Sequence, residues 1–210
     1  MENASTTISL VRHGHVEGIS PPRFRGRSDI GLTARGEAQA AAVARAFANE
    51  PPPSAIYSSP LRRCVMTASA IAHACRLQLQ TLDALVDIDY GTWQWKTPDE
   101  AKADSPELLA LWYSAPERVR FPEGESLQDV ALRAADALRF ACRRHAGERI
   151  VFVTHDSVIR VIFVQLLGMP LAYLRRIAQD PCAVNEVTLN DAAPSVSLVN
   201  GTTPYRPAQT

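Results

Sequence analysis

The sequence has no excess of charge of either sign, because 22 lysine and arginine residues balance 22 aspartate and glutamate residues. Proteins that bind nucleic acid or an anionic membrane through a general electrostatic field normally carry a basic excess. The composition therefore gives no sign of a nucleic acid or a membrane as a partner. One local exception is a cluster of Arg23, Arg25 and Arg27, which either attracts an anionic substrate or is simply solvated.

Cysteine is scarce, with four residues, and no two of them form a Cys-x-x-Cys pair. This pattern favours buried free thiols in a reducing compartment over a framework of disulfides. Long hydrophobic runs are also absent: no apolar stretch is long enough to span a bilayer, and residues 1–7 lack the apolar region of a signal peptide. We therefore expect a cytoplasmic protein.

What the sequence does contain is an alternation of short apolar strands with helical segments. The 210 residues, 46% of them apolar, suffice for one domain with a substantial core, which we place over residues 1–210. Strands are expected at about residues 7–11, 55–58, 79–86, 150–154 and 183–189. Helices are expected at about residues 33–49, 59–76, 126–145, 157–167 and 170–178. This order predicts an α/β fold with three layers, α/β/α, around a mostly parallel central sheet.

Two stretches fall outside this alternation. Residues 88–125 are irregular and rich in proline and tryptophan, which predicts an inserted cap with one or two helices. The tail after Asn190 is polar and is expected to be partly disordered. N-cap signals mark three helix starts, at Thr33, at Ser59-Pro60 and at Ser126 with Asp129.

Two histidines stand directly after apolar strand segments. His13 follows residues 8–12, and His155 follows residues 150–154. Because ligands in such sheets bind beyond the carboxyl ends of the strands, we expect the two side chains to share one pocket. A histidine can attack phosphorus, and the guanidinium of the preceding Arg12 matches the geometry of phosphate oxygens.

Further residues extend this pattern along nearly the whole chain. They form six ordered blocks: Leu10, Arg12, His13 and Gly14; Gly26, Asp29, Leu32 and Thr33; Gly36, Gln39 and Ala40; Ser59, Leu61, Arg63, Thr67 and Ala68; Gly124, Glu125 and Ser126; and Val153, Thr154 and His155, followed by Val158, Ile159 and Arg160. In these blocks the chain resembles the histidine phosphatase superfamily, the phosphoglycerate-mutase-like proteins. The resemblance implies a phosphoglycerate-mutase-like fold and hydrolysis of a small phosphate ester, with no metal and no organic cofactor.

The resemblance also implies roles for particular residues. His13 corresponds to the nucleophile that takes the phosphoryl group as a phosphohistidine. Arg12, Arg63 and His155 correspond to the groups that bind the phosphate oxygens, and Arg63 rather than Arg62 fits the register. A neutral imidazole is a competent nucleophile near pH 7, and two nearby arginines disfavour its protonation.

The chain departs from the family at the general acid. Most members carry a glutamate in a Leu-x-Glu-x-x-x-Gly segment, and here the aspartate Asp87 occupies that position, between Leu85 and Gly91. Its side chain is one methylene shorter, and a misplaced proton donor is costly. Asp87 is the predicted donor. Asp156 is the rival, because a distant branch of the superfamily uses the aspartate of a His-Asp pair.

A second departure lies in the loop after Gly14. Many members continue with Glu-Thr or Glu-Ser, whereas this chain has His15-Val16 and lacks the hydroxyl. The loop must therefore bind its substrate differently: either Arg23 or Arg25 replaces the hydroxyl, or both arginines are simply solvated. Arg25 and Gly26 are the predicted substrate-binding residues there. Substrate choice is expected to depend on the cap, about residues 90–122.

Several alternatives stay open. Phosphoglycerate mutase activity is one, although the acidic to neutral segment from Gly91 to Phe121 favours hydrolysis, and a non-catalytic phosphate-binding relative is another. A metallohydrolase that uses His13, His15, His155 and Asp156 is disfavoured by the length of the chain. No function is expected of His15, His73 or His145, of which the last two lie in predicted helices without partners. The particular phosphate ester and the oligomeric state do not follow from the sequence.

Overall fold

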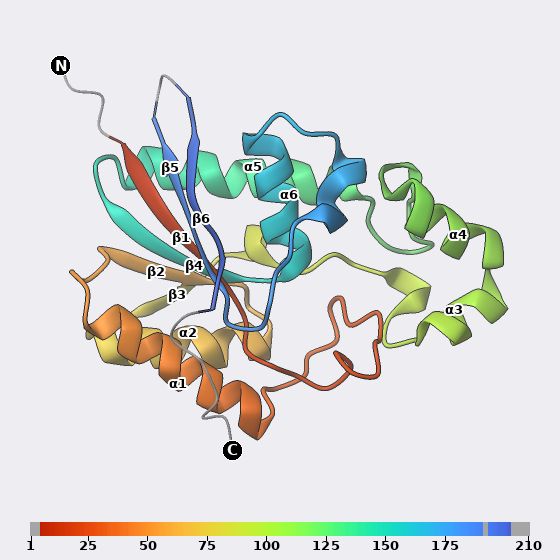
Figure 1. Ribbon diagram of the computed structural model, residues 1–210, viewed down its shortest axis with the longest axis horizontal. Helices are drawn as coiled ribbons and strands as arrows, with labels where there is room; N and C mark the ends of the chain where they lie inside the picture. Colours follow the sequence, from red (N-terminus) through yellow and green to blue (C-terminus); the bar gives the residue numbers. More distant parts are fainter. Residues whose placement is uncertain (1–4, 191–192, 203–210) are drawn as a thin grey trace.

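The computed structural model describes residues 5–190 and 193–202, which are built around one six-stranded sheet with the order β3-β2-β4-β1-β5-β6 (Figure 1). The strands are β1 (Thr6–Arg12), β2 (Ala55–Ser58), β3 (Leu79–Thr81), β4 (Arg149–Thr154), β5 (Val184–Leu189) and β6 (Ser195–Gly201). β1, β2, β3 and β4 pair in parallel, whereas β5 is antiparallel to both β1 and β6. The predicted mostly parallel sheet is thus confirmed, with one reversed strand.

Helices cover both faces of this sheet, as the alternating pattern predicts. α1 (Ala34–Ala48) and α2 (Arg62–Cys75) lie on one face, and α5 (Leu127–Arg144) and α6 (Asp156–Leu166) lie on the other (Figure 1). Successive residues of β4 serve opposite sides: Val151 packs with α1 and α2, and Phe152 packs with α5 and α6. A strand buried on both faces needs an unbroken apolar run, which is what the sequence of β4 provides. No helix in the described part of the chain could cross a membrane.

Two of the predicted helix starts are confirmed, and one is wrong. The Thr33 side chain accepts a hydrogen bond from the Gly36 amide, and Ser126 and Asp129 form a reciprocal capping box. α2 begins at Arg62 instead of following a Ser59 cap. The reason lies outside the helix.

The start of α2 is held by a residue from the loop before α1. The Asp29 carboxylate accepts a hydrogen bond of 2.7 Å from the Arg62 amide, whereas the Ser59 hydroxyl accepts from the Leu61 amide at 3.3 Å, before the helix begins. A carboxylate at a helix N-terminus satisfies a free amide and interacts favourably with the helix dipole. A cap supplied from 33 residues away is invisible to a local motif.

Three further expectations are wrong in their extent. β3 was expected to reach residue 86 but ends at Thr81, and residues 83–85 form a 3-10 helix. The chain turns there because Leu85 is buried, and the Leu85 carbonyl accepts a hydrogen bond of 2.6 Å from the Thr154 hydroxyl. Residues 171–176 form a 3-10 helix, η4, and not an α-helix. The tail after Asn190 was expected to be partly disordered, but part of it forms β6, because pairing with β5 stabilises this polar segment. The remaining tail residues, 191–192 and 203–210, lie outside the described residues.

The cap contains the expected short helices, α3 (Pro98–Asp104) and α4 (Pro106–Ser114). It lies beyond the carboxyl ends of β1 and β4, on the right of Figure 1. Aromatic rings hold it against the loop after β1: Tyr90 packs edge-on against Phe24, Trp112 and Phe121, with ring centroids 4.9–6.1 Å apart. The cap thereby covers the carboxyl ends of β1 and β4, which His13 and His155 follow.

Candidate active site

His13 is placed by the backbone on both sides of it. Its amide donates to the Thr154 carbonyl at 3.0 Å, which extends the pairing of β1 with β4 by one residue. The next residue must be glycine, because a Cβ on Gly14 would lie 2.6 Å from the Gly36 carbonyl oxygen of α1. Gly14 therefore allows the loop to pass close against α1, and the imidazole of His13 is fully buried at the end of the strand.

The two strand–histidine units meet. The His13 and His155 ring centroids are 5.3 Å apart, at an interplanar angle of 61°. His155 directly follows β4 and is the N-cap residue of α6, and its Nε2 lies 2.8 Å from the Ser59 hydroxyl. The expected pairing of two imidazoles at one edge of the sheet is what the structure contains.

The hydrogen bond of His13 fixes the state of its ring. Nδ1 lies 2.7 Å from the Gly14 carbonyl oxygen, which can only accept, so Nδ1 carries the proton. Nε2 is then the nitrogen with the free lone pair. It is buried and has no hydrogen-bond partner within the described residues. Burial lowers the pKa of His13 well below its usual 6.5, and the cations Arg63 and Arg12 lower it further. The imidazole is thus held neutral.

Three guanidinium groups surround this ring. Arg12 donates to the Gln179 carbonyl at 2.5 Å, Arg25 donates to Gly18 at 2.7 Å, and Arg63 donates to Gly26 at 2.6 Å. The Nε atom of each arginine is buried without a partner in the part of the chain that the structure describes. Buried donors are rarely left unpaired. These donors form a set suited to an anion, and the lone pair of His13 Nε2 lies beside them.

Gly26 contributes through its backbone. Its φ is +40°, and a Cβ there would lie 2.7 Å from the Ile88 carbonyl oxygen, so the loop requires glycine. The Gly26 carbonyl accepts from Arg63 and orients that side chain. Arg62, by contrast, lies on the outer side of α2 and takes no part in this cluster.

The two candidate proton donors lie in different surroundings. Burial raises the pKa of Asp87, although Arg63, 3.0 Å from its Oδ2, partly opposes the shift. Burial acts in the same direction on Asp156, but the guanidinium groups of Arg12 and Arg160 outweigh it and hold the pKa of Asp156 far below its usual range. Asp87 is therefore the carboxyl that retains a proton more readily.

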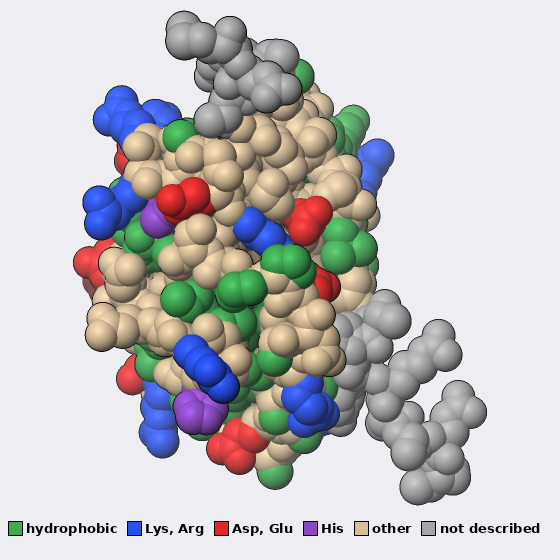
Figure 2. All heavy atoms as spheres, turned by 90° about the vertical axis from the view of Figure 1, so that its left-hand side faces the viewer, with side chains coloured by type: hydrophobic (Ala, Val, Ile, Leu, Met, Phe, Trp, Pro, Cys, Tyr) green, Lys and Arg blue, Asp and Glu red, His purple; other side chains and the backbone are tan. Residues whose placement is uncertain are grey.

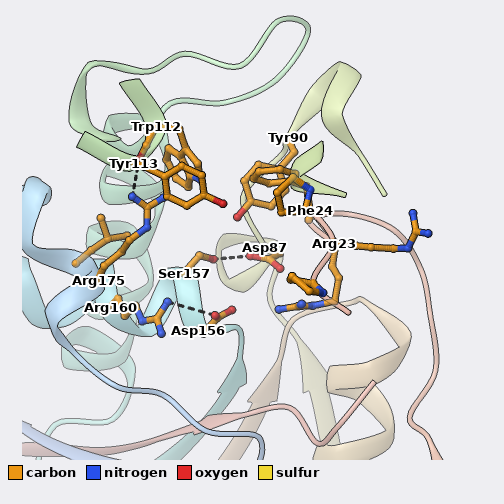
Figure 3. A pocket seen from close by; sticks show the side chains of 15 residues that line it. Arg23, Phe24, Asp87, Tyr90, Trp112, Tyr113, Asp156, Ser157, Arg160 and Arg175 are labelled. Atoms are coloured by element: carbon orange, nitrogen blue, oxygen red, sulfur yellow. Dashed lines mark hydrogen bonds and ion pairs between the residues drawn. The ribbon is translucent and has the colours of Figure 1, made fainter. Parts of the chain in front are cut away.

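A cavity of about 190 Å³ opens above Asp87, between the sheet edge and the cap (Figure 3). Phe24, Tyr90, Trp112 and Tyr113 supply its aromatic wall, and Arg23, Arg25, Arg160 and Arg175 supply its positive charge. The opposite end of the molecule differs: its visible surface carries basic and acidic side chains interspersed (Figure 2). The cavity lining therefore carries four arginines against the two carboxyl groups of Asp87 and Asp156.

Sequence reasoning missed two features. Ser157 and Arg175 line the cavity, and only the closeness of Ser157 to His155 in the sequence hinted at a role. His145 was expected to lack partners, but it is buried, with Nε2 2.9 Å from the Tyr57 hydroxyl and Nδ1 2.6 Å from Glu148. Its partners come from β2 and from the turn before β4, which its helical position does not reveal.

The other histidines do not join the cluster. His15 Nδ1 lies 2.9 Å from the Thr33 hydroxyl, at the start of α1, and His73 is exposed on α2. No three His, Cys, Asp or Glu side chains of the described residues are grouped so that they could hold a metal ion.

The comparison with protein families identifies one match. The family model of the histidine phosphatase superfamily, branch 1, matches residues 8–202. Phosphoserine phosphatase 1 from Hydrogenobacter thermophilus is 35% identical over 165 residues, which are 79% of this chain and 78% of that protein. A probable phosphoglycerate mutase, GpmB from Enterobacter sp., is 29% identical over 88% of this chain and 86% of that protein.

One solved structure is informative about the site. A mutant of phosphoserine phosphatase from Entamoeba histolytica, with a histidine replaced by alanine and phosphoserine bound, superposes with a TM-score of 0.86 at 25% identity. The alignment covers 96% of this chain and all of that one, at 100%. The fold described above is therefore shared with an enzyme that has been seen with a small phosphate ester.

Proposed function

The chain belongs to the histidine phosphatase superfamily, and on that premise we propose that it hydrolyses a small phosphorylated metabolite through a phosphohistidine on His13. One observation carries the proposal. The unprotonated Nε2 of a buried, neutral imidazole lies among three arginines whose Nε donors have no partner within the described residues. Such a cluster is unfavourable by itself, and a phosphate group would satisfy it.

In the first step, His13 Nε2 attacks phosphorus and the bond to the leaving oxygen breaks. Arg12, Arg63 and His155 stabilise the charge on the equatorial phosphate oxygens, which is the main requirement in phosphoryl transfer. Arg25 adds a further cation, and Gly26 holds Arg63 in place. The Nδ1–H group of His13 donates a hydrogen bond to the Gly14 carbonyl, and this bond stabilises the positive charge that develops on the imidazole.

Asp87 supplies the proton for the leaving group. Its pKa is raised by burial, and it lines the cavity in which a leaving group would sit. In the second step the resulting carboxylate accepts a proton from the water that attacks the phosphohistidine. Asp156 has a different role, because it pairs with Arg12 and Arg160 and keeps both guanidinium groups in position.

The cavity favours a substrate with a second negative charge. Arg160 donates its Nε to the Ile177 carbonyl at 2.8 Å, and Arg175 donates to the Trp112 carbonyl at 2.5 Å. Both cations are thus oriented before any substrate arrives. Phosphoserine, which carries a carboxylate and is named for two of the similar proteins above, is the first substrate to test.

The experiment combines a substrate panel with trapping of the intermediate. Phosphate release is measured with O-phosphoserine, 3-phosphoglycerate and glucose 6-phosphate, and labelled phosphate is trapped on the protein by rapid quenching in base. We expect turnover and an acid-labile, base-stable label in the wild type, and neither in His13→Ala. His73→Ala, an exposed change on α2, serves as the matched control and keeps both.

Other outcomes would point to the alternatives. Isomerised phosphoglycerate without net phosphate release would identify a mutase, and no label with any ester would identify a non-catalytic phosphate-binding protein. Turnover abolished by EDTA and restored by a divalent ion would favour the metal-dependent alternative. Cytoplasmic location and the absence of a nucleic-acid partner stay predictions from the sequence.

A further inference from the structure

The carboxyl group of Asp87 is surrounded by four partners. The Ile88 amide, at 2.9 Å, and the Ser157 hydroxyl bond to Oδ1, while Arg63, at 3.0 Å, and His155 Nδ1, at 3.4 Å, contact Oδ2. Of these partners, only Ser157 also lines the cavity. Asp87 and Ser157 thus both line the cavity, and the hydroxyl contacts the carboxyl group on one side and the space for a leaving group on the other.

Ser157 is well placed for this position. It is the second residue of α6, two residues after His155, and only 8% of it is exposed. Figure 3 shows its hydroxyl directed at Asp87 along the floor of the cavity. A serine hydroxyl can accept one proton while it donates another, which neither an amide nor an arginine can do.

The shorter side chain of Asp87 makes such a group useful. An aspartate in place of the glutamate that most family members carry shortens the reach of the acid by one methylene, and a shortfall on the order of 1 Å can cost about 10²-fold in rate. We propose, on the basis of the function above, that the Ser157 hydroxyl relays the proton between Asp87 and the leaving oxygen.

The relay balances in both half-reactions. In the structure Ser157 donates to Asp87 Oδ1, so the relay requires this hydrogen bond to reverse when the carboxyl group is protonated. In the first half-reaction, Asp87 Oδ1 then gives its proton to Ser157 Oγ, whose own proton passes to the ester oxygen as the phosphorus–oxygen bond breaks. In the second, a water oxygen bonds to phosphorus, the bond to His13 Nε2 breaks, and a water proton enters Ser157 as the serine proton returns to Asp87. Orthophosphate leaves and the carboxyl group is neutral again.

Two esters with different leaving groups separate a relay from a structural role. 4-Nitrophenolate leaves without protonation, whereas an alkoxide does not. Since kcat/KM reports the steps up to loss of the leaving group, Ser157→Ala should lower it about 10²-fold or more for the best alkyl ester of the panel. For 4-nitrophenyl phosphate the change should stay within about threefold.

A matched control removes a different buried hydroxyl. Ser9 in β1 is fully buried, and its Oγ has no partner within the described residues, so Ser9→Ala should leave kcat/KM for both esters unchanged. An equal loss for both esters in Ser157→Ala would show that the hydroxyl merely supports the fold and would overturn the relay.

A longer acid provides the second test. In Asp87→Glu/Ser157→Ala, the added methylene occupies the space of the lost hydroxyl and brings the carboxyl group to the leaving oxygen directly. We expect this double variant to recover at least about tenfold in alkyl-ester kcat/KM over Ser157→Ala. If the double variant has the same unfolding temperature as the wild type but does not recover alkyl-ester kcat/KM, the relay is contradicted.

The two proposals fail in different ways. A wild type that releases phosphate from neither kind of ester overturns the phosphatase function, and the relay with it. If the wild type hydrolyses both kinds of ester and Ser157→Ala changes kcat/KM by the same factor for both, the relay alone is overturned.

Discussion

A buried histidine lies at each end of the parallel strands: His145 at their amino ends, here called the amino edge, and His13 at their carboxyl ends, the carboxyl edge. The ring nitrogens of the two histidines differ in their hydrogen bonds. At the amino edge, both ring nitrogens of His145 are bonded, to Tyr57 and Glu148, and its carbonyl accepts from the Thr6 hydroxyl at 3.0 Å. At the carboxyl edge, Nε2 of His13 is buried without a partner within the described residues. The same residue type thus completes a network at one edge and leaves one incomplete at the other.

The difference separates stability from function. A buried polar group without a partner costs about 1–3 kcal/mol, which both ring nitrogens of His145 avoid, although Nε of Arg149 at the same edge is also buried without a partner within the described residues. The carboxyl edge keeps Nε2 of His13 and the Nε atoms of Arg12, Arg25 and Arg63 unsatisfied within the described residues. Local rules of good packing are broken where a protein must bind something else.

The largest effect is expected from Arg63. Arg63→Ala removes a cation that contacts Asp87 and lies beside His13, and kcat/KM for the best ester should fall about 10³-fold or more. Arg63→Lys should recover little, because an ammonium group lacks the planar fork. Arg149→Ala, at the amino edge, removes an arginine paired with Glu50 and should leave kcat/KM within about twofold. Comparable losses in both would erase the contrast between the edges.

The next effect distinguishes the two carboxyl groups of the site. Asp87→Asn removes the proton donor, and alkyl-ester kcat/KM should fall about 10²- to 10³-fold. Asp156→Asn only loosens Arg12 and Arg160 and should cost less than about tenfold. Steady-state kinetics at one pH suffices for this comparison, and a reversed order of the two losses would assign the donor role to Asp156.

A stability effect is expected at the amino edge. His145→Ala leaves the Tyr57 hydroxyl and Glu148 without their partner and should lower the free energy of unfolding by about 2 kcal/mol, with kcat within about twofold of the wild type. Chemical denaturation measures the first quantity, and His73→Ala on the exposed face of α2 is the control. If His145→Ala unfolds like the wild type, the network has no stabilising role.

The smallest effect concerns pH. The pKa of His13 is lowered by burial and by Arg63 and Arg12, so below pH 6.5 the unfolded chain binds a proton that the folded chain does not. Stability should therefore fall as the pH drops from 6.5 towards the lowered pKa, by up to about 1.4 kcal/mol per pH unit for this residue. His13→Gln should flatten the dependence by that amount in denaturation series between pH 7 and 5. Parallel curves for the two proteins would show that His13 titrates normally.

Local features of the chain were readable from the sequence, because their partners lie a few residues away. The cap of Thr33 on Gly36 and the box of Ser126 with Asp129 each span three residues. The strand–histidine units were equally legible, since an apolar run buried on both faces of a sheet ends where a polar residue begins. With the direction of parallel strands, this placed His13 beside His155.

Long-range contacts decided the rest. Nothing near Arg62 in the sequence indicates that Asp29 caps α2, and nothing in the polar tail indicates that β6 pairs with β5. The end of β3 likewise depends on where Leu85 can be buried. Such contacts are invisible to a local pattern, because their energy comes from atoms far away along the chain.

The order of residues indicated the α/β fold, the family and most of the side chains that meet at the carboxyl edge, but not Ser157 or Arg175. It left Asp87 and Asp156 as rival proton donors, because the identity of a residue does not reveal the environment of its side chain. Only the tertiary structure separated them: one carboxyl group is buried against a serine hydroxyl, and the other lies between two guanidinium groups. A pKa is set by solvation and by neighbouring charge in three dimensions, and neither quantity is encoded in the order of residues alone.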